Sequence, residues 1–595
     1  MASAYPRTTW RPPPHHEIGH DPNTKPNLTS TLGRGAYDYD MRYPDETALS
    51  EAEEIFARWF EQSGKAPGLA WGVVADGALV HAGGLGTLHV GQQHLPQADS
   101  SFRIASMTKS FIAATILLLR DEGRLRLDDP VALHVPKLGE LPLATTDSPL
   151  PTLRDLLSMR SGYPGDDPWA DRLESMPAPE YLALMRTPKT HARAAGIAFD
   201  YSNIGFTLLG QVITNVCSNE FQDVVSERIL APLGLQQTTW SEHGLDAARV
   251  ATGYAKFDES WEQQPLQPTG AFSALGGLYS TVDDLATWVA GFVDAWPPRD
   301  DPDTHPLSRA SRREMQQIVT AIPLQIEADS IGALRARSDG YCLGLLSREE
   351  LRTGRTVGHS GGYPGFGSHM RWHPATGIGV IALANGRYAG TDVPACAALE
   401  VLVKRAPRRA RVEPLAAVEP LRQEIDAAIA AGDLTPLVPL FADNVALDES
   451  LDRRAAQIAA LPERHGALAP AGALQTRTPT QVRWWLAGER GRVGVEIMLT
   501  PEHPPRLQLL AIESVLPAPA ELDDAVTRAL EQLEHESDLA PLVWPIRSTA
   551  WVACDGHRTG AVLIEGVVID VRLRIDLDDD PVARCEPEER FPAPW

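Results

Sequence analysis

The chain has 595 residues, of which 43% are hydrophobic, and this is enough for several globular cores. Its formal net charge of −24 would repel nucleic acids and anionic membrane surfaces, so we expect neither as a partner. We therefore expect a soluble, globular protein with an acidic, solvated surface.

The cysteines and the N-terminal region indicate a cytoplasmic protein without bound metal. The cysteines are odd in number, widely spaced and without a Cys-x-x-Cys pair: Cys217, Cys342, Cys396, Cys554 and Cys585. Reduced thiols and no structural zinc are expected from this pattern. Residues 1–40 have no apolar core of the signal-peptide type, and no run elsewhere reaches transmembrane length. His16 to His20 matches the zinc-protease pattern His-Glu-x-x-His, but prolines before it and Gly19 within it oppose the required helix. Residues 1–45 are therefore predicted to form an extended arm.

A helix and a hairpin are predicted ahead of the first chemical motif. Residues 47–62 have the spacing of an amphipathic helix. Residues 69–74 and 78–82 are apolar runs on either side of Asp76-Gly77, which is typical of a tight β-turn.

The first motif is a serine and a lysine three residues apart, Ser106 and Lys109, at the start of a helix. Residues 111–119 are apolar on every face, which predicts a helix enclosed by protein. Residues three apart share a helix face, so the Lys109 amine can approach the Ser106 hydroxyl. A buried ammonium tends to lose its proton, and a neutral lysine can then activate a serine nucleophile. The pattern Ser-x-x-Lys is common by chance, so further motifs must support this hypothesis.

Two further motifs follow at large separations. Tyr201 and Asn203 lie in a turn before an apolar helix at 206–216, where one intervening residue lets both side chains point the same way. Alone, this is also a common helix cap. Residues 356–367 contain His-Ser-Gly-Gly at positions 359–362, which suits either a strand that a substrate backbone can approach closely or a glycine-rich loop. A strand at 378–384 follows.

Taken together in this order, Ser-x-x-Lys, Tyr-x-Asn and His-x-Gly resemble the class C β-lactamase and penicillin-binding-protein superfamily, which includes esterases and D-peptidases. The resemblance covers residues 46–405. It implies an α/β (α+β) sandwich, in which helices flank an antiparallel sheet and an all-helical lobe is inserted. It also implies a site between the lobes.

The resemblance further implies a role for each motif residue. Ser106 would attack a carbonyl, Lys109 would take its proton, and Tyr201 would relay a proton to the leaving group. Asn203 would hold Lys109 and the substrate, and the backbone amides of Ser106 and Gly362 would form the oxyanion hole. His359, in the place where β-lactamases usually carry lysine, would be a further catalytic residue, and Ser360 and Gly361 would contact the substrate. No metal or organic cofactor is expected for this chemistry.

The C-terminal third is predicted to hold two smaller domains. The basic, proline-bearing stretch 404–411 marks a linker. Residues 406–516 are predicted as an α+β domain, perhaps NTF-like, with helices at 421–431 and 448–461 and strands at 481–486 and 492–499. Residues 517–595 are predicted as a small α+β domain with a helix from Glu521 and strands at 549–553, 560–564 and 567–575. Residues 433–438 echo 538–543, and this leaves duplication and coincidence equally open. The acidic run 576–580 has proline where a calcium loop needs glycine, so we interpret it as a solvated turn.

Three functions remain open at this stage. The leading hypothesis is a serine hydrolase that cleaves a small ester, as an esterase, or an amide of a small molecule or short peptide. The second is a D-amino-acid-specific peptidase, acyltransferase or β-lactamase of the same superfamily. The third is a catalytically idle scaffold that forms a homo-oligomer through its C-terminal domains. Esters are preferred over β-lactams, because a largely neutral His359 attracts a substrate carboxylate less than lysine does.

Overall fold

The computed structural model describes residues 44–138, 142–187, 191–328, 334–350, 353–406 and 413–515, together with four strands between residues 549 and 586. Several predictions lie outside the described residues. These are the N-terminal arm up to residue 43, the helix expected from Glu521, the second copy of the repeat at 538–543, and the acidic turn from residue 577.

The predicted helix and hairpin at the start of the body are confirmed. Helix α1 spans Glu46–Ser63, and strands β1 (Gly68–Ala75) and β2 (Ala78–Gly86) pair in antiparallel fashion. The turn between them places Asp76 at φ 50° and Gly77 at φ 75°. A two-residue hairpin turn of type I′ requires a positive φ at both of its residues, and this explains the Asp-Gly pair.

Nine strands form the central sheet, in the order β2-β1-β13-β12-β11-β10-β9-β7, with β8 also pairing with β9. Every neighbouring pair is antiparallel. The late strands are β7 (Thr320–Ala321), β8 (Gln325–Ala328), β9 (Leu334–Tyr341), β10 (Leu346–Glu350), β11 (Gly354–Tyr363), β12 (Phe366–His373) and β13 (Ile378–Ala384). Strand β1, from the start of the chain, therefore pairs with β13, the last strand of this sheet in the sequence.

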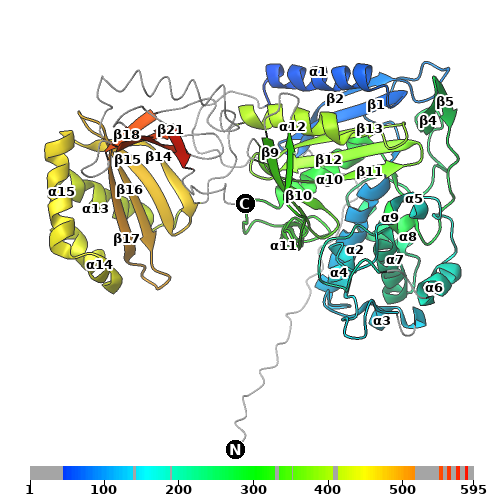
Figure 1. The fold of residues 1–595 in the computed structure, drawn as a ribbon, viewed down its shortest axis with the longest axis horizontal. Coiled ribbons are helices and arrows are strands. Elements are labelled where there is room, and N and C mark those ends of the chain that lie inside the picture. Colours follow the sequence, from blue (N-terminus) through cyan, green and yellow to red (C-terminus); the bar gives the residue numbers. More distant parts are fainter. Residues whose placement is uncertain are drawn as a thin grey trace, which may run out of the picture. The chain divides into compact units, whose positions relative to one another are not determined.

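Helices cover both faces of this sheet (Figure 1). Helices α1 and α12 (Asp392–Arg405) lie on one face, and α2 (Thr108–Asp121) and α10 (Val282–Asp294) lie on the other. Strand alternation divides β1 between two cores: Trp71 packs with Phe56 of α1, whereas Val74 belongs to the core around α2. The predicted helix-flanked antiparallel sandwich is confirmed.

A mainly helical lobe is inserted between α2 and α10. Its helices are α3 (Val131–His134), α4 (Leu153–Leu157), α5 (Asp167–Ala170), α6 (Ala178–Arg186), α7 (Asn203–Cys217), α8 (Phe221–Val225) and α9 (Ser273–Gly276). The same segment carries a small hairpin, β4 (Tyr254–Phe257) and β5 (Ser260–Gln263), that the sequence did not predict.

The C-terminal region has a hydrophobic core of its own. Its helices are α13 (Val418–Ala431), α14 (Asp443–Asp448) and α15 (Leu451–His465), and its sheet has the order β14-β15-β16-β17. These strands are β14 (Ala469–Thr478), β15 (Gln481–Ala487), β16 (Arg492–Leu499) and β17 (Leu507–Val515). A second antiparallel sheet contains β18 (Thr549–Ala553), β19 (Thr559–Ile564), β20 (Val571–Asp576) and β21 (Ala583–Glu586).

Two sequence-based boundaries shift. Helix α12 continues to Arg405, so the first two residues of the basic stretch 404–411 belong to a helix. The helix expected at 448–461 begins at Leu451 and continues to His465. Within the described part of the chain, none of the helices combines the length and the hydropathy needed to cross a bilayer.

Candidate active site

Ser106 lies in a tight turn that leads into α2. The turn spans Ala105–Met107 as a 3-10 helix, and Ala105 adopts φ 47°, an unusual conformation for a residue with a side chain. Two hydrogen bonds hold the backbone just before it: the Ser368 hydroxyl of β12 donates to the Ile104 carbonyl at 2.7 Å, and the amide of Ile104 donates to the Leu278 carbonyl at 3.0 Å. The serine is therefore presented by a constrained backbone.

Lys109 is completely buried one turn further along α2. Its Nζ lies 2.8 Å from Ser106 Oγ and donates to the Leu275 carbonyl at 2.7 Å. The predicted approach of the lysine to the serine is thus present in the geometry. The rings of Tyr201 and Phe206 lie 5.1 Å and 5.6 Å from the same nitrogen.

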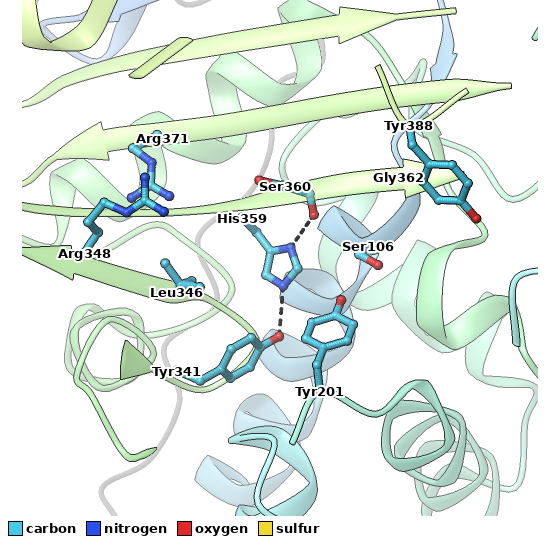
Figure 2. A pocket seen from close by; sticks show the side chains of 10 residues that line it. All are labelled: Ser106, Tyr201, Tyr341, Leu346, Arg348, His359, Ser360, Gly362, Arg371 and Tyr388. Atoms are coloured by element: carbon cyan, nitrogen blue, oxygen red, sulfur yellow. Dashed lines mark hydrogen bonds between the residues drawn. The ribbon is translucent and has the colours of Figure 1, made fainter. Parts of the chain in front are cut away.

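The Tyr-x-Asn motif lies at the start of α7. Tyr201 precedes the N-cap residue Ser202, and its hydroxyl points towards Ser106 (Figure 2). Asn203 is the first residue of the helix and is fully buried. The carboxylate of Asp166 accepts hydrogen bonds from the amides of Asn203 and Ile204 at 2.7 Å and 2.9 Å, so it fixes this helix start.

Strand β11 carries the third motif and passes beside the serine turn. Strand β10 pairs with β11 only up to Leu346 opposite Gly358, whereas β12 pairs with it as far as Tyr363. A Cβ on Gly361 would lie 2.2 Å from the Ile104 carbonyl oxygen, so glycine is needed for β11 to approach the turn. Of the two predictions for this stretch, strand and glycine-rich loop, the strand is the observed one.

His359 is buried and held on both sides of its ring. Its Nδ1 lies 2.6 Å from the Ser360 carbonyl, which can only accept, so Nδ1 carries the proton and Nε2 accepts from the Tyr341 hydroxyl at 2.9 Å. Burial, and next the Lys109 charge, lower the pKa of His359 to about 3. The imidazole is therefore neutral at physiological pH, as expected from the sequence.

These residues enclose a cavity of about 250 Å³ between the sheet and the helical lobe. Five predicted residues line it: Ser106, Tyr201, His359, Ser360 and Gly362. The other three, Lys109, Asn203 and Gly361, are buried and do not line it. The sequence analysis missed the remaining lining residues, which are Tyr341, Leu346, Arg348, Arg371 and Tyr388.

Two of the missed residues make one end of the cavity cationic. Arg348 and Arg371 lie together on the side of His359 away from Tyr388 (Figure 2). Arg348 pairs with Asp339 at 3.0 Å. Arg371, by contrast, donates to two neutral groups, Nε2 of His369 at 3.2 Å and the Thr356 hydroxyl at 3.0 Å.

A hydrogen-bonded chain joins Arg371 to Ser360. Since His369 Nε2 accepts from Arg371, its Nδ1 carries the proton and donates to Ser360 Oγ at 2.8 Å. Burial, and next the Arg371 charge, hold the pKa of His369 well below its usual value, so this ring is also neutral. The hydroxyl of Ser360 is left to donate its own proton towards the cavity.

Among the residues that the structure describes, no three His, Cys, Asp or Glu side chains come together to form a metal site. The Ser106 hydroxyl and the Tyr201 phenol line the cavity, and the Lys109 amine is buried directly behind the serine. A hydroxyl, a buried amine and a phenol together are a donor set suited to acyl transfer by a serine nucleophile.

A serine paired with a buried lysine, beside an antiparallel sheet flanked by helices, defines the class of Ser-x-x-Lys serine hydrolases. The profile of one family of this class, Beta-lactamase, matches residues 56–404, which is more than half of the chain. The chain therefore belongs to the beta-lactamase family, and it is a serine hydrolase.

Individual relatives are distant. The D-alanyl-D-alanine-carboxypeptidase/endopeptidase AmpH of Escherichia coli (strain K12) is 26% identical over 323 residues, covering 52% of this chain and 77% of AmpH. Protein flp of Staphylococcus aureus (strain MW2) is 25% identical over 54% of this chain and 60% of its own length. Beta-lactamase-like protein 2 of Dictyostelium discoideum is 27% identical over 42% of this chain and 47% of its own length. The matches to the last two thus span less than two thirds of those proteins.

A solved structure shares the fold. The octameric penicillin-binding protein homologue from Pyrococcus abyssi is 20% identical, with a TM-score of 0.52, over 90% of this chain and all of that one. At this identity the likeness shows the architecture and carries no statement about substrate.

Proposed function

We propose that the chain hydrolyses small esters or amides through an acyl-enzyme formed on Ser106. The observation that carries the proposal is the 2.8 Å separation of Lys109 Nζ and Ser106 Oγ at the wall of a cavity that Tyr201 also lines. In its neutral form the Lys109 amine would give one N–H to the Leu275 carbonyl and could direct its lone pair at the serine proton. Lys109 is therefore assigned as the base.

Different groups would assist the leaving group and stabilise the oxyanion. Tyr201, whose hydroxyl points at Ser106, would pass a proton to the leaving group. The amides of Ser106 and Gly362 would donate to the carbonyl oxygen as its charge develops. Asn203, which is buried at the start of α7, would hold the lysine and the substrate, as the family resemblance implies.

The experiment that tests this assignment is labelling with a fluorophosphonate followed by intact mass measurement. The expected result is one adduct on the wild type and none on Ser106→Ala. Persistence of the adduct on the variant would show that another residue is the nucleophile. Absence of any adduct or turnover on the wild type would favour the idle scaffold.

For the substrate, we propose a neutral ester as the first candidate. Both ring nitrogens of His359 are engaged within the protein and the ring is uncharged, so it offers no cation to a substrate carboxylate. Esters also need less help at the leaving group than amides do, because an alkoxide or phenoxide departs more readily than an amine. A comparison of kcat/KM for p-nitrophenyl butyrate and nitrocefin tests this choice, and an advantage for nitrocefin would reject it.

The cationic end of the cavity supports a second candidate, a D-amino-acid-specific peptidase. Arg371 and the Ser360 hydroxyl lie where they could bind a peptide carboxylate, since guanidinium and hydroxyl groups both donate to it. The relative AmpH is named for D-alanyl-D-alanine cleavage. Hydrolysis of a peptide ending in D-Ala-D-Ala with a free carboxylate, but not of its C-terminal amide, would favour this candidate over the esterase.

Location and assembly also remain proposals. The free thiols of Cys217, Cys342 and Cys396 fit a reducing compartment, so we retain the cytoplasm as the proposed location. A homo-oligomer is proposed because the structurally similar homologue is described as octameric. Fractionation of the source cells and mass photometry of the purified protein would test the two proposals separately.

A further inference from the structure

A buried carboxylate in the helical lobe contacts three separate segments of the chain that lie beside the active site. Glu174 lies between α5 and α6, with only 2% of its surface exposed. Its Oε2 forms an ion pair with Arg103 and accepts the Tyr363 hydroxyl at 2.7 Å, and its Oε1 accepts the Ser273 hydroxyl at 3.0 Å. A buried charge is retained only where such partners compensate for its desolvation.

Two of these partners, Arg103 and Ser273, lie just before residues that form the Ser106–Lys109 pair or bind its lysine. Arg103 ends strand β3 (Phe102–Arg103), three residues before Ser106. Ser273 begins α9, two residues before Leu275, whose carbonyl binds the amine of Lys109. A shift of either segment would change the separation of the serine and the lysine.

The third partner follows the proposed oxyanion donor directly. Tyr363 is the last residue of β11 and comes immediately after Gly362. Burial, and next the Glu174 charge, raise the pKa of Tyr363 far above its usual value, so the phenol stays protonated and donates to Glu174. The Arg103 guanidinium lies 4.4 Å from the centre of the same ring, which gives Tyr363 a second contact with the serine segment.

We propose that Glu174 is a positioning residue, which holds the nucleophile turn, the lysine-binding helix α9 and the oxyanion strand β11 in their working geometry. This inference rests on the proposed acyl transfer at Ser106. Glu174 does not line the cavity, so its effect on the reaction passes through Arg103, Ser273 and Tyr363. Effects on turnover should therefore exceed effects on substrate binding.

The test uses Tyr363→Phe in the full chain, because this change removes one hydroxyl and keeps the ring beside Arg103. Loss of an oxyanion donor costs about 100- to 1,000-fold in kcat, so a displaced donor should cost less, roughly tenfold. We expect this fall in kcat for p-nitrophenyl butyrate, with KM changed by less than about twofold.

Tyr279→Phe is the matched control. The ring of Tyr279 also faces Arg103, at 5.0 Å, but its hydroxyl donates to Glu242 at 3.5 Å, whereas the Tyr363 hydroxyl donates to Glu174. Like Tyr363→Phe, the Tyr279→Phe substitution removes one phenol oxygen from a ring that faces Arg103. We expect it to keep kcat within about twofold of the wild type, as for a residue outside the reacting groups.

Ser273→Ala provides a second, independent measurement and carries the test should Tyr363→Phe not fold. It should lower kcat in the same way, and the double variant should lose less than the product of the two single losses, since both act through one carboxylate. Independent, multiplicative losses would overturn the proposal.

Failure of this inference can be told from failure of the proposed function. Turnover that survives Ser106→Ala would reject the proposed function itself. If Ser106→Ala is inactive but Tyr363→Phe retains the wild-type kcat, matches Tyr279→Phe, or loses activity only through KM, then the positioning role of Glu174 alone is wrong.

Discussion

The two ends of the cavity differ in charge, although they lie within one 250 Å³ space. At the reaction end, the ring of His359 is kept neutral, and the amine of Lys109 is buried against Ser106. At the other end, Arg348 and Arg371 present two guanidinium groups. Under the proposed function, the reaction end would carry the acyl transfer, and the cationic end would matter only for a substrate that bears a carboxylate.

The largest effect is expected at the reaction end. Ser106→Ala removes the only oxygen that the proposed acyl-enzyme can use, and should lower kcat by at least about a thousandfold with the fold intact. Lys109→Ala should lose nearly as much, because a nucleophile and its base act as a unit. Hydrolysis of p-nitrophenyl butyrate and circular dichroism measure the two properties. More than a few per cent of residual activity in Ser106→Ala would contradict the assignment.

Substitution at the cationic end should separate the two candidate substrates. Arg371→Gln removes a charge that could pair with a substrate carboxylate but touches no reacting atom. For a carboxylate-bearing peptide, kcat/KM should fall roughly 10- to 100-fold, as expected for loss of a charged hydrogen bond. Hydrolysis of p-nitrophenyl butyrate should change little. Equal losses on both substrates would mean that Arg371 supports the fold and does not select the substrate.

The sequence predicted the reaction end much better than the cationic end. Ser106 and Lys109 are one helical turn apart, so local periodicity is enough to bring them together. Arg371 and Arg348 stand on strands separated from the serine by more than two hundred residues, and only the pairing of the sheet brings them to the cavity. A signal was nevertheless present, since Arg371 is a charged residue between the apolar Met370 and Trp372 in strand β12.

The helical lobe shows the same limit. The segment before Ala195 looks merely polar in the sequence, yet it contains α5, α6 and three buried carboxylates, Asp166, Asp171 and Glu174. Composition cannot separate a solvated acid from a buried one, because the difference lies in partners that are distant in sequence. The Leu275 carbonyl beneath Lys109 was missed for a related reason, since backbone acceptors leave no trace in residue type.

The neutrality of His359 gives a prediction on stability. Its pKa is about 3 in the folded protein and about 6.5 when unfolded, so the unfolded chain binds a proton that the folded chain excludes. The contribution of neutral His359 to the free energy of unfolding is therefore fully present above pH 6.5 and is lost as the pH falls towards 3. At pH 5 the loss is about 2 kcal/mol.

His359→Gln should lack this acid sensitivity. Between pH 7.5 and pH 5, its free energy of unfolding should fall by about 2 kcal/mol less than that of the wild type. Urea titrations of both proteins at the two pH values provide the measurement, and His369 serves as an internal constant because both proteins retain it. Parallel losses would indicate that His359 is protonated in the folded state, and the reaction end would then be cationic as well.

The smallest effect is expected from removing the C-terminal region. Both ends of the cavity are built from residues between Ser106 and Tyr388, and among the residues that the structure describes, none beyond Ala406 belongs to the cores of the body. The residues from Val418 to Leu510 have a separate core. A chain ending after Ala406 should therefore fold and retain kcat/KM within a few-fold for the neutral ester and for the carboxylate-bearing peptide. If the truncated chain still unfolds cooperatively but the ratio of kcat/KM for the ester to kcat/KM for the peptide changes, the C-terminal region adjusts the cationic end. Failure of the truncated chain to fold would place the domain boundary elsewhere.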